Sequence, residues 1–246
     1  VFVANGGAAG QQSPHFLIHF FPRDDGEGFF NFMFKCKESL TYGQKKMWGN
    51  NLPIMMGNHF KRNPASWHTG NRTVPKQLED IYNKSTVIYE DEKTLCVLPD
   101  RGAAPGHIMI YSKDEESDIT KLSQEDSEHL FFTASFAATA VFEGLGAQAT
   151  NIILKSGKTE DNPEGRLVLH IIPRSQGDGL EKMMWEPKQP SYDLDGIKGR
   201  IKDKTWKIQY KEEKKEVKSP VLEQKVMKLG KSSPEDEIKK AIERLH

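Results

Sequence analysis

The stretch GRLVLHIIPR, from Gly165 to Arg174, decides the interpretation of the rest of the chain. Aliphatic and β-branched residues surround one histidine, His170, and the stretch stops at Pro173. Proline lacks the backbone N–H that a central strand donates, so it marks the end or the edge of a strand. The pattern therefore predicts a buried strand that ends at an edge or a turn.

A second stretch repeats this pattern 151 positions earlier. The sequence PHFLIHFFPR, residues 14 to 23, places His19 on His170 and Arg23 on Arg174. Without a gap, the same spacing aligns further residues: Pro22 with Pro173, Gly6 with Gly157, Gly26 with Gly177, Gly28 with Gly179, and Val1–Val3 with Ile152–Leu154. Agreement at one fixed spacing over roughly thirty residues predicts an internal duplication.

Both stretches resemble the signature strand of the histidine triad (HIT) superfamily, in which three histidines alternate before two apolar residues and often Pro-Arg. The run NGGAAGQ, residues 5 to 11, is similar to that family's phosphate loop. Residues 88 to 113, IYEDEKTLCVLPDRGAAPGHIMIYSK, resemble its opening hairpin and third strand. The resemblance implies an α+β fold, with a HIT-like antiparallel sheet and a main helix. It covers the second copy from about Ser85 to Leu180 but only the last third of the first.

A four-part organisation follows. Residues 1–34 are the C-terminal part of a first HIT-like domain, 35–84 an irregular connecting segment, 85–180 a complete second HIT-like domain, and 181–246 a basic C-terminal extension that ends in a helix. A few strands cut from a sheet leave open backbone edges. Other sequence must therefore complete the first copy: further N-terminal residues, a separate polypeptide, or a sheet edge of the second copy.

Residues 123 to 146 are predicted to form the main helix. Ser123 suits the N-cap, Glu125 and Asp126 favour the helix dipole, and Gly144 or Gly146 ends the helix. Its apolar stripe consists of Leu130, Ala134, Ala137, Ala138 and Val141, and four phenylalanines widen it: Phe131, Phe132, Phe136 and Phe142. The extra width predicts that the helix contacts a second body, such as the other copy.

In the HIT family the middle histidine attacks the α-phosphorus of a nucleotide, so the resemblance assigns the nucleophile to that position. The three positions are His15, Leu17 and His19 in the first copy, and Arg166, Val168 and His170 in the degenerate second one. An aliphatic side chain has no lone pair with which to form a phosphohistidine. Losing a nucleophile commonly costs on the order of 10⁴-fold in rate. We therefore expect a pseudoenzyme with no catalytic residue in either copy.

Phosphate binding without turnover is a separate expectation for the first copy. Main-chain N–H groups of a glycine-rich turn can converge on an anion because no Cβ stands in the way. The candidate phosphate- or nucleotide-binding residues are Asn5, Gly6, Gly10, Gln11, His15 and His19. The corresponding loop of the second copy carries Glu160, Asp161 and Glu164, whose charge disfavours phosphate. The alternative for His19 and His170 is a hydrogen-bonded core role.

Composition excludes several classes of protein. Lys+Arg and Asp+Glu are equal at 35 each among 246 residues, and no apolar run is long enough to span a membrane. The two cysteines, Cys36 and Cys96, lack CxxC spacing, so we expect no disulfide scaffold, zinc site or other metal, and no cofactor. Such cysteine use predicts a reduced intracellular compartment, the cytoplasm or the mitochondrial matrix.

The C-terminal extension is locally basic. Between Lys198 and Lys231 twelve Lys and Arg residues accompany five Asp and Glu residues. This excess favours RNA or an acidic protein face as a partner, although a solvated tail accounts for it equally well. Ser233-Pro234, followed by Ile238, Ala241, Ile242 and Leu245, predicts the terminal helix.

Two classes of function remain. The first is a catalytically inactive HIT-like protein that acts as a binding or architectural subunit of a larger assembly, such as a ribosomal or organellar complex. A variant of it keeps nucleotide binding at the first copy without turnover. The second class is a nucleotidyl hydrolase or transferase acting on nucleoside phosphates, with water attack assisted by His15 or His19. We favour the first class because Leu17 and Val168 occupy the two nucleophile positions.

Overall fold

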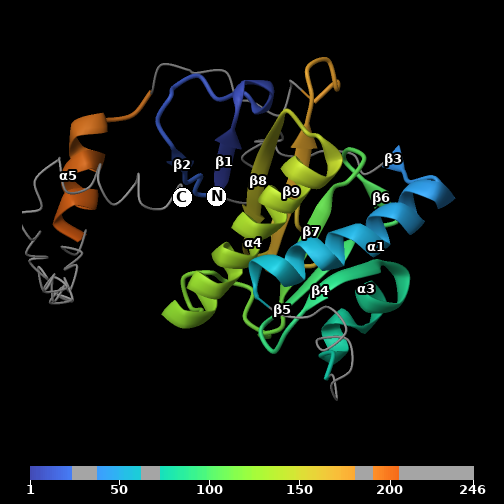
Figure 1. The fold of residues 1–246 in the computed structure, drawn as a ribbon. Coiled ribbons are helices and arrows are strands. Elements are labelled where there is room, and N and C mark those ends of the chain that lie inside the picture. Colours follow the sequence, from blue (N-terminus) through green and yellow to red (C-terminus); the bar gives the residue numbers. More distant parts are fainter. Residues whose placement is uncertain (24–37, 62–72, 181–190, 205–246) are drawn as a thin grey trace, which may run out of the picture. The chain divides into compact units, whose positions relative to one another are not determined.

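The computed structural model describes residues 1–23, 38–61, 73–180 and 191–204 (Figure 1). The chain divides into two compact units, Val1–Pro187 and Lys188–His246. In the second unit the described helix is α5, Leu194–Lys204. The predicted terminal helix and the basic residues after Lys204 lie outside the described residues.

A seven-stranded antiparallel sheet organises the first unit. Its order is β2-β1-β8-β9-β7-β5-β4. The strands are β1 Phe2–Asn5, β2 Ile18–His19, β4 Thr86–Glu90, β5 Thr94–Leu98, β7 Ile108–Ser112, β8 Ala149–Lys155 and β9 Val168–Arg174. Two short strands, β3 Glu38–Ser39 and β6 Arg101–Gly102, pair separately. The expected α+β fold with a HIT-like antiparallel sheet is confirmed.

Two long helices lie on one face of this sheet (Figure 1). Helix α4, Gln124–Leu145, is the predicted main helix. Ser123 caps it, because its Oγ accepts a hydrogen bond from the N–H of Asp126 at 3.1 Å. Gly146 ends it in the left-handed conformation, with φ 66°. Both predicted boundary signals are therefore confirmed.

Helix α1, Tyr42–His59, packs beside α4 and corrects the expectation of an irregular segment over residues 35–84. Thr41 and Gln44 form a capping box at its start. Trp48, Leu52 and Met56 recur every four residues and are buried. The helix also contains glycines, asparagines and a proline, which are poor helix formers, so the sequence pattern does not predict it. Tertiary packing of one face overrides that local preference.

The segment before β4 forms two short elements. They are the 3-10 turn η2, Lys76–Leu78, and helix α3, Glu79–Lys84. These elements also depart from the irregular segment expected over residues 35–84.

The stretch Pro14–Arg23 differs from β9 although the two sequences match. All seven residues of β9 are buried, whereas only Ile18 and His19 of the earlier stretch form a strand. Phe20 is 75% exposed. Strand β9 lies between β8 and β7, while β2 ends the described sheet. The two stretches that match in sequence therefore differ in strand length and in burial, and the duplication stays a prediction.

Strand β1 pairs along its length with β8, a strand of the segment 85–180. Phe2 lies opposite Ile153 and Asn5 opposite Thr150. The N–H of Leu154 donates to the carbonyl of Val1 at 2.9 Å. Of the three alternatives for the backbone of residues 1–5, this is the one observed.

Helix α1 yields a prediction about stability. Leu52→Ala removes a wholly buried side chain beneath α4, so we expect a loss of about 2–5 kcal/mol in the free energy of unfolding. Ile54 of the same helix is 51% exposed, so Ile54→Ala serves as control and should change stability by only about 0.5 kcal/mol. Urea denaturation measures both. Equal losses in the two variants would contradict the placement of α1.

Candidate functional site

The histidines at the third triad position of each stretch, His19 and His170, lie on the sheet face opposite α1 and α4. Directly paired residues share a face, and one such row crosses five strands: His19, Phe2, Ile153, His170 and Met109. Neighbouring strands lie about 4.8 Å apart, which separates His19 from His170 by about 14 Å. The two imidazoles are too far apart to act on one phosphate group.

His170 is buried beside His107, the histidine that precedes β7. Nδ1 of His170 lies 3.1 Å from Nε2 of His107, and the N–H of Ala103 donates to Nδ1 of His107 at 3.0 Å. Burial, assisted by the charge of Lys155, lowers the pKa of His107 to about 3. Burial also lowers the pKa of His170 well below its ordinary value, with smaller effects of His107 and Lys155. Both rings are therefore neutral near pH 7.

Neutrality fixes the position of each proton. Nδ1 of His107 accepts from a backbone N–H, so its proton is on Nε2 and points at His170. Nδ1 of His170 then accepts this bond, and His170 carries its own proton on Nε2. The pair is a directed hydrogen-bond chain from the Ala103 backbone into β9.

The middle triad position in the stretch around β9, Val168, is apolar and buried. Val168 is 4% exposed and packs in a buried cluster with Leu95, Val97 and Tyr111 of the sheet and with Leu78 of η2. The cluster presents no nucleophilic atom at the position where the family carries its middle histidine.

The first triad position in the same stretch, Arg166, forms two ion pairs. Arg166 lies 3.3 Å from Asp80 of α3 and 3.1 Å from Glu164. The guanidinium therefore ties α3 to the segment that leads into β9.

The glycine-rich loop between β1 and β2 folds back on itself. Gly7–Ala9 form the 3-10 turn η1. The N–H of Gly6 donates to Oε1 of Gln11 at 2.7 Å, and Nε2 of Gln11 donates to the carbonyl of His15 at 3.3 Å. Gly6 has φ 94°, and a Cβ there would lie 2.8 Å from that of Ala149. Gln11 therefore shapes the loop with both ends of its amide.

The structure brings most candidate binding residues into this one loop. Asn5 donates to Oγ1 of Thr150 at 3.5 Å, Gly10 adopts a left-handed φ of 87°, and the His15 side chain is exposed. His19 lies on β2, with its ring near Phe2 and Phe21. Leu17, at the middle triad position, is 47% exposed.

The corresponding loop of residues 156–164 is held by a different amide. Nδ2 of Asn162 donates to the carbonyls of Gly157 and Arg166, each at 2.8 Å. Sequence reasoning missed this role, although the spacing of 151 places Asn162 on Gln11.

Asp161 of this loop is paired inside the protein. Its carboxylate lies 3.3 Å from Arg23 and 3.6 Å from Lys155. Burial acts to raise its pKa, but the hydroxyl of Thr159 and the two cations outweigh burial and lower it. This carboxylate therefore stabilises the loop in its ionised form.

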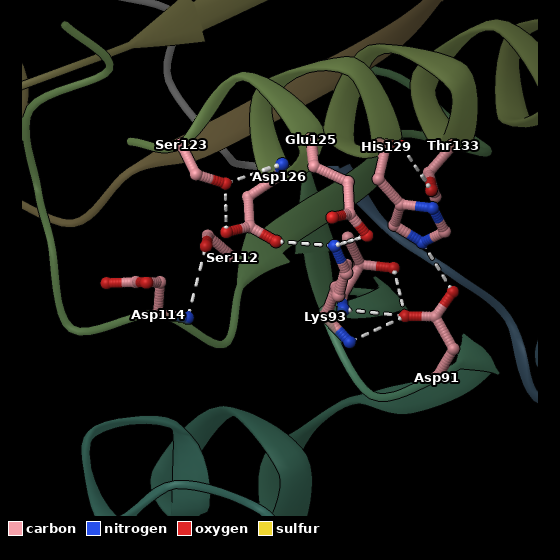
Figure 2. Close-up of polar contacts among 10 residues, drawn as sticks. Asp91, Lys93, Ser112, Asp114, Ser123, Glu125, Asp126, His129 and Thr133 are labelled. Atoms are coloured by element: carbon pink, nitrogen blue, oxygen red, sulfur yellow. Dashed lines mark hydrogen bonds and ion pairs between the residues drawn. The ribbon is translucent and has the colours of Figure 1, made fainter. Parts of the chain in front are cut away.

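A polar cluster joins the β4–β5 turn to the start of α4 (Figure 2). Oδ1 of Asp91 accepts from the N–H groups of Lys93 and Thr94, and Oδ2 lies 2.6 Å from Nε2 of His129. The Nζ of Lys93 lies 2.6 Å from Glu125 and 2.8 Å from Asp126. Hydrogen bonds to Asp126 and Glu125 raise the pKa of Lys93 to about 12. The cluster fixes the main helix to the sheet.

Within residues 1–23, 38–61, 73–180 and 191–204, no three His, Cys, Asp or Glu side chains gather closely enough to hold a metal ion. No helix in the same ranges has the length and apolar character needed to cross a membrane.

Comparison with known proteins agrees with this architecture. The HIT domain family matches residues 81–177. An uncharacterized HIT-like protein of Methanocaldococcus jannaschii is 30% identical over 117 residues, covering 47% of this chain and 88% of that protein. An uncharacterized 13.1 kDa HIT-like protein of Mesomycoplasma hyorhinis is 25% identical over 89 residues, covering 36% and 80%.

Among solved structures, a HIT family protein from Bacillus anthracis is 23% identical with a TM-score of 0.45, covering 53% of this chain and 94% of that one. The antiparallel sheet, with its helices on one face and a triad strand at its centre, defines a HIT-type α+β domain. The chain belongs to the histidine triad family.

The buried histidine pair predicts a pH dependence of stability. Folding lowers the pKa of both histidines, that of His107 to about 3, so as the pH falls below about 6.5 the unfolded chain binds more protons than the folded one. The free energy of unfolding should therefore fall as the pH drops below 6.5, by about 1.4 kcal/mol per pH unit for each histidine.

Two variants test the origin of that slope in urea titrations at pH 7, 6 and 5. His107→Gln should remove about half of the slope, because glutamine stays neutral. The exposed His15 offers a control, and His15→Gln should leave the slope unchanged. A slope that is the same in all three proteins would contradict the neutral buried pair.

Proposed function

We propose that this chain is a catalytically inactive HIT protein, a tandem duplication with degenerate triads that acts as a binding or architectural subunit of a larger assembly. The observation that carries the proposal is the aliphatic side chain at each middle triad position, Leu17 and Val168. Neither side chain has a lone pair to attack phosphorus.

Strand register supports the duplication. The pair Phe2–His19 in the β1–β2 hairpin and the pair Ile153–His170 in the β8–β9 hairpin are separated by 151 residues at both members. One side-chain hydrogen bond follows the same spacing: Gln11 donates to the carbonyl of His15, and Asn162 donates to the carbonyl of Arg166. One spacing therefore relates both a strand register and a loop contact.

The pairing between β1 and β8 supports the same architecture. Phe2 lies opposite Ile153, the residue onto which the spacing maps it, and Val3 lies opposite Ile152. A register centred on equivalent residues is what a local two-fold axis between two copies produces. In this proposal two HIT-like halves lie side by side in one continuous sheet.

The two halves differ in their proposed ability to bind a nucleotide. In the second half, Leu78 packs with Val168, and Arg166 is engaged by Asp80 and Glu164, so we propose that it binds none. In the first half, the glycine-rich loop and the exposed His15 support retained phosphate or nucleotide binding by Asn5, Gly6, Gly10, Gln11, His15 and His19.

The proposed partners are protein subunits and, at the basic extension, RNA or an acidic protein face. Helix α5 carries the described part of that extension and contributes Lys198, Arg200, Lys202 and Lys204. Clustered cations of this kind favour a polyanionic partner.

The competing function is a nucleotidyl hydrolase or transferase. The observation that favours it is the neutral His107–His170 chain, an ordered imidazole array that a wholly inert sheet has no need to keep. The two functions differ in turnover.

Turnover is tested with dinucleoside polyphosphates and nucleoside phosphoramidates. We expect no release of nucleoside monophosphate above the uncatalysed rate, because both nucleophile positions are aliphatic. Measurable activity that His19→Ala abolishes, and that Phe20→Ala at the neighbouring exposed position preserves, would establish the competing function instead.

Nucleotide binding at the first half is tested by calorimetry with AMP. Gln11→Ala removes the amide that shapes the loop and should weaken AMP binding about ten-fold, the effect of one or two lost hydrogen bonds. Gln12→Ala, at the exposed neighbouring position, is the matched control and should bind as the unaltered chain does. Equal weakening in both variants, or no binding by the unaltered chain, would count against a site in this loop.

A further inference from the structure

One buried amide connects the two halves of the sheet. Asn151 on β8 is wholly buried, and its Nδ2 donates to the carbonyl of Ala9 at 3.0 Å and, at 3.5 Å, to that of Val3. Its Oδ1 accepts from Nη1 of Arg174 at 2.6 Å. A single side chain therefore contacts the glycine-rich loop, β1 and the end of β9.

Arg174 is held rigidly from its other side. It is 2% exposed, and its Nε and Nη2 donate to the two carboxylate oxygens of Asp178 at 2.7 and 3.1 Å. The same carboxylate accepts from the N–H groups of Ser175 and Leu180. These bonds outweigh burial and lower the pKa of Asp178. A buried guanidinium requires such complete pairing, so its geometry is fixed.

The loop that Asn151 contacts is the one that bears the candidate binding residues. The N–H groups of Ala9 and Gln11 donate to the carbonyl of Gly6, and that of Gly10 donates to Gly7. These short-range bonds close the loop but do not position it on the sheet. The contact from Asn151 to Ala9 does so, together with the close approach of Gly6 to Ala149.

A reciprocal contact runs in the opposite direction. Arg23, which the spacing of 151 maps onto Arg174, pairs with Asp161 in the loop of residues 156–164 at 3.3 Å. Arg23 thus contacts the loop of the second half directly. Arg174 reaches the loop of the first half through Asn151.

We propose that Asn151, held by Arg174 and Asp178, is a positioning residue through which the second half sets the conformation and phosphate affinity of the loop at residues 5–11. The affinity part of this inference rests on the proposed function, in which that loop binds phosphate. In this proposal Asn151 acts on the loop through the carbonyl of Ala9.

The substitution Asn151→Asp separates the two contacts of this amide. Aspartate has the same shape and still accepts from Arg174, but it cannot donate to Ala9 or Val3. Hydrogen exchange of the Gly6, Ala9, Gly10 and Gln11 amides should accelerate about ten-fold, the effect of one lost hydrogen bond, while β9 and α4 stay protected. AMP affinity, measured by calorimetry, should fall about ten-fold.

Asn162→Asp is the matched control, because it makes the same chemical change in the other loop. It should leave exchange at residues 6–11 unaltered. If Asn151→Asp fails to fold, Asp178→Asn weakens the grip on Arg174 without altering Asn151 and should accelerate the same loop amides.

The outcomes distinguish this inference from the proposed function. Faster loop exchange in Asn151→Asp, with no AMP binding by the unaltered chain, supports the positioning contact and overturns phosphate binding. Unaltered loop exchange overturns the inference whatever AMP does. Acceleration spread equally over β9 and α4 also overturns it, because that result indicates a general loss of stability.

Discussion

The backbone pairing of β1 with β8 is the interaction on which the rest of the structure depends. Without it, the β1–β2 hairpin would be an isolated two-stranded element, which is marginal in water. With it, Phe2 joins Ile153 and Ile172 in one buried cluster, and the sheet reaches seven strands. The pairing also brings the glycine-rich loop within reach of Asn151, so the geometry of the candidate site follows from the register of two strands.

The two faces of this sheet have different roles. Helices α1 and α4 bury one face through Leu52, Met56 and Val141, which stabilises the domain. The opposite face carries the row that contains His19 and His170, and the chain covers part of it with Leu78. Catalysis in this family needs a nucleophile on that second face. Around β9 that face carries the apolar Val168, the neutral His170 and the buried Arg174.

Sequence alone was sufficient for the elements with strong local signals. The run of Gly165–Arg174 predicted a buried strand, and Ser123 and Gly146 predicted the ends of the main helix. Helix α1 was missed because its residues form helix poorly and its order comes from packing. The exposure of Phe20 was missed because burial depends on a neighbouring strand, which no local pattern reveals.

The candidate site likewise has parts that the sequence predicts and parts that only the folded structure reveals. Triad positions could be found from spacing, since they alternate along a short stretch of sequence, although the described strands include only His19, Val168 and His170 of them. The Asn151–Arg174–Asp178 chain could not, because buried polar side chains from two strands and a turn meet only after the sheet forms. The fixed spacing of 151 did contain one unused signal, the alignment of Gln11 with Asn162, whose amides each donate to the carbonyl four residues later.

In the proposed inactive protein, neither half can form a covalent nucleotidyl intermediate. Intact-protein mass spectrometry after incubation with a nucleoside phosphoramidate measures this directly, followed by peptide mapping at neutral pH. We expect the protein mass to stay unchanged. A nucleotidyl adduct on His15 or His19 that forms and then hydrolyses would contradict it.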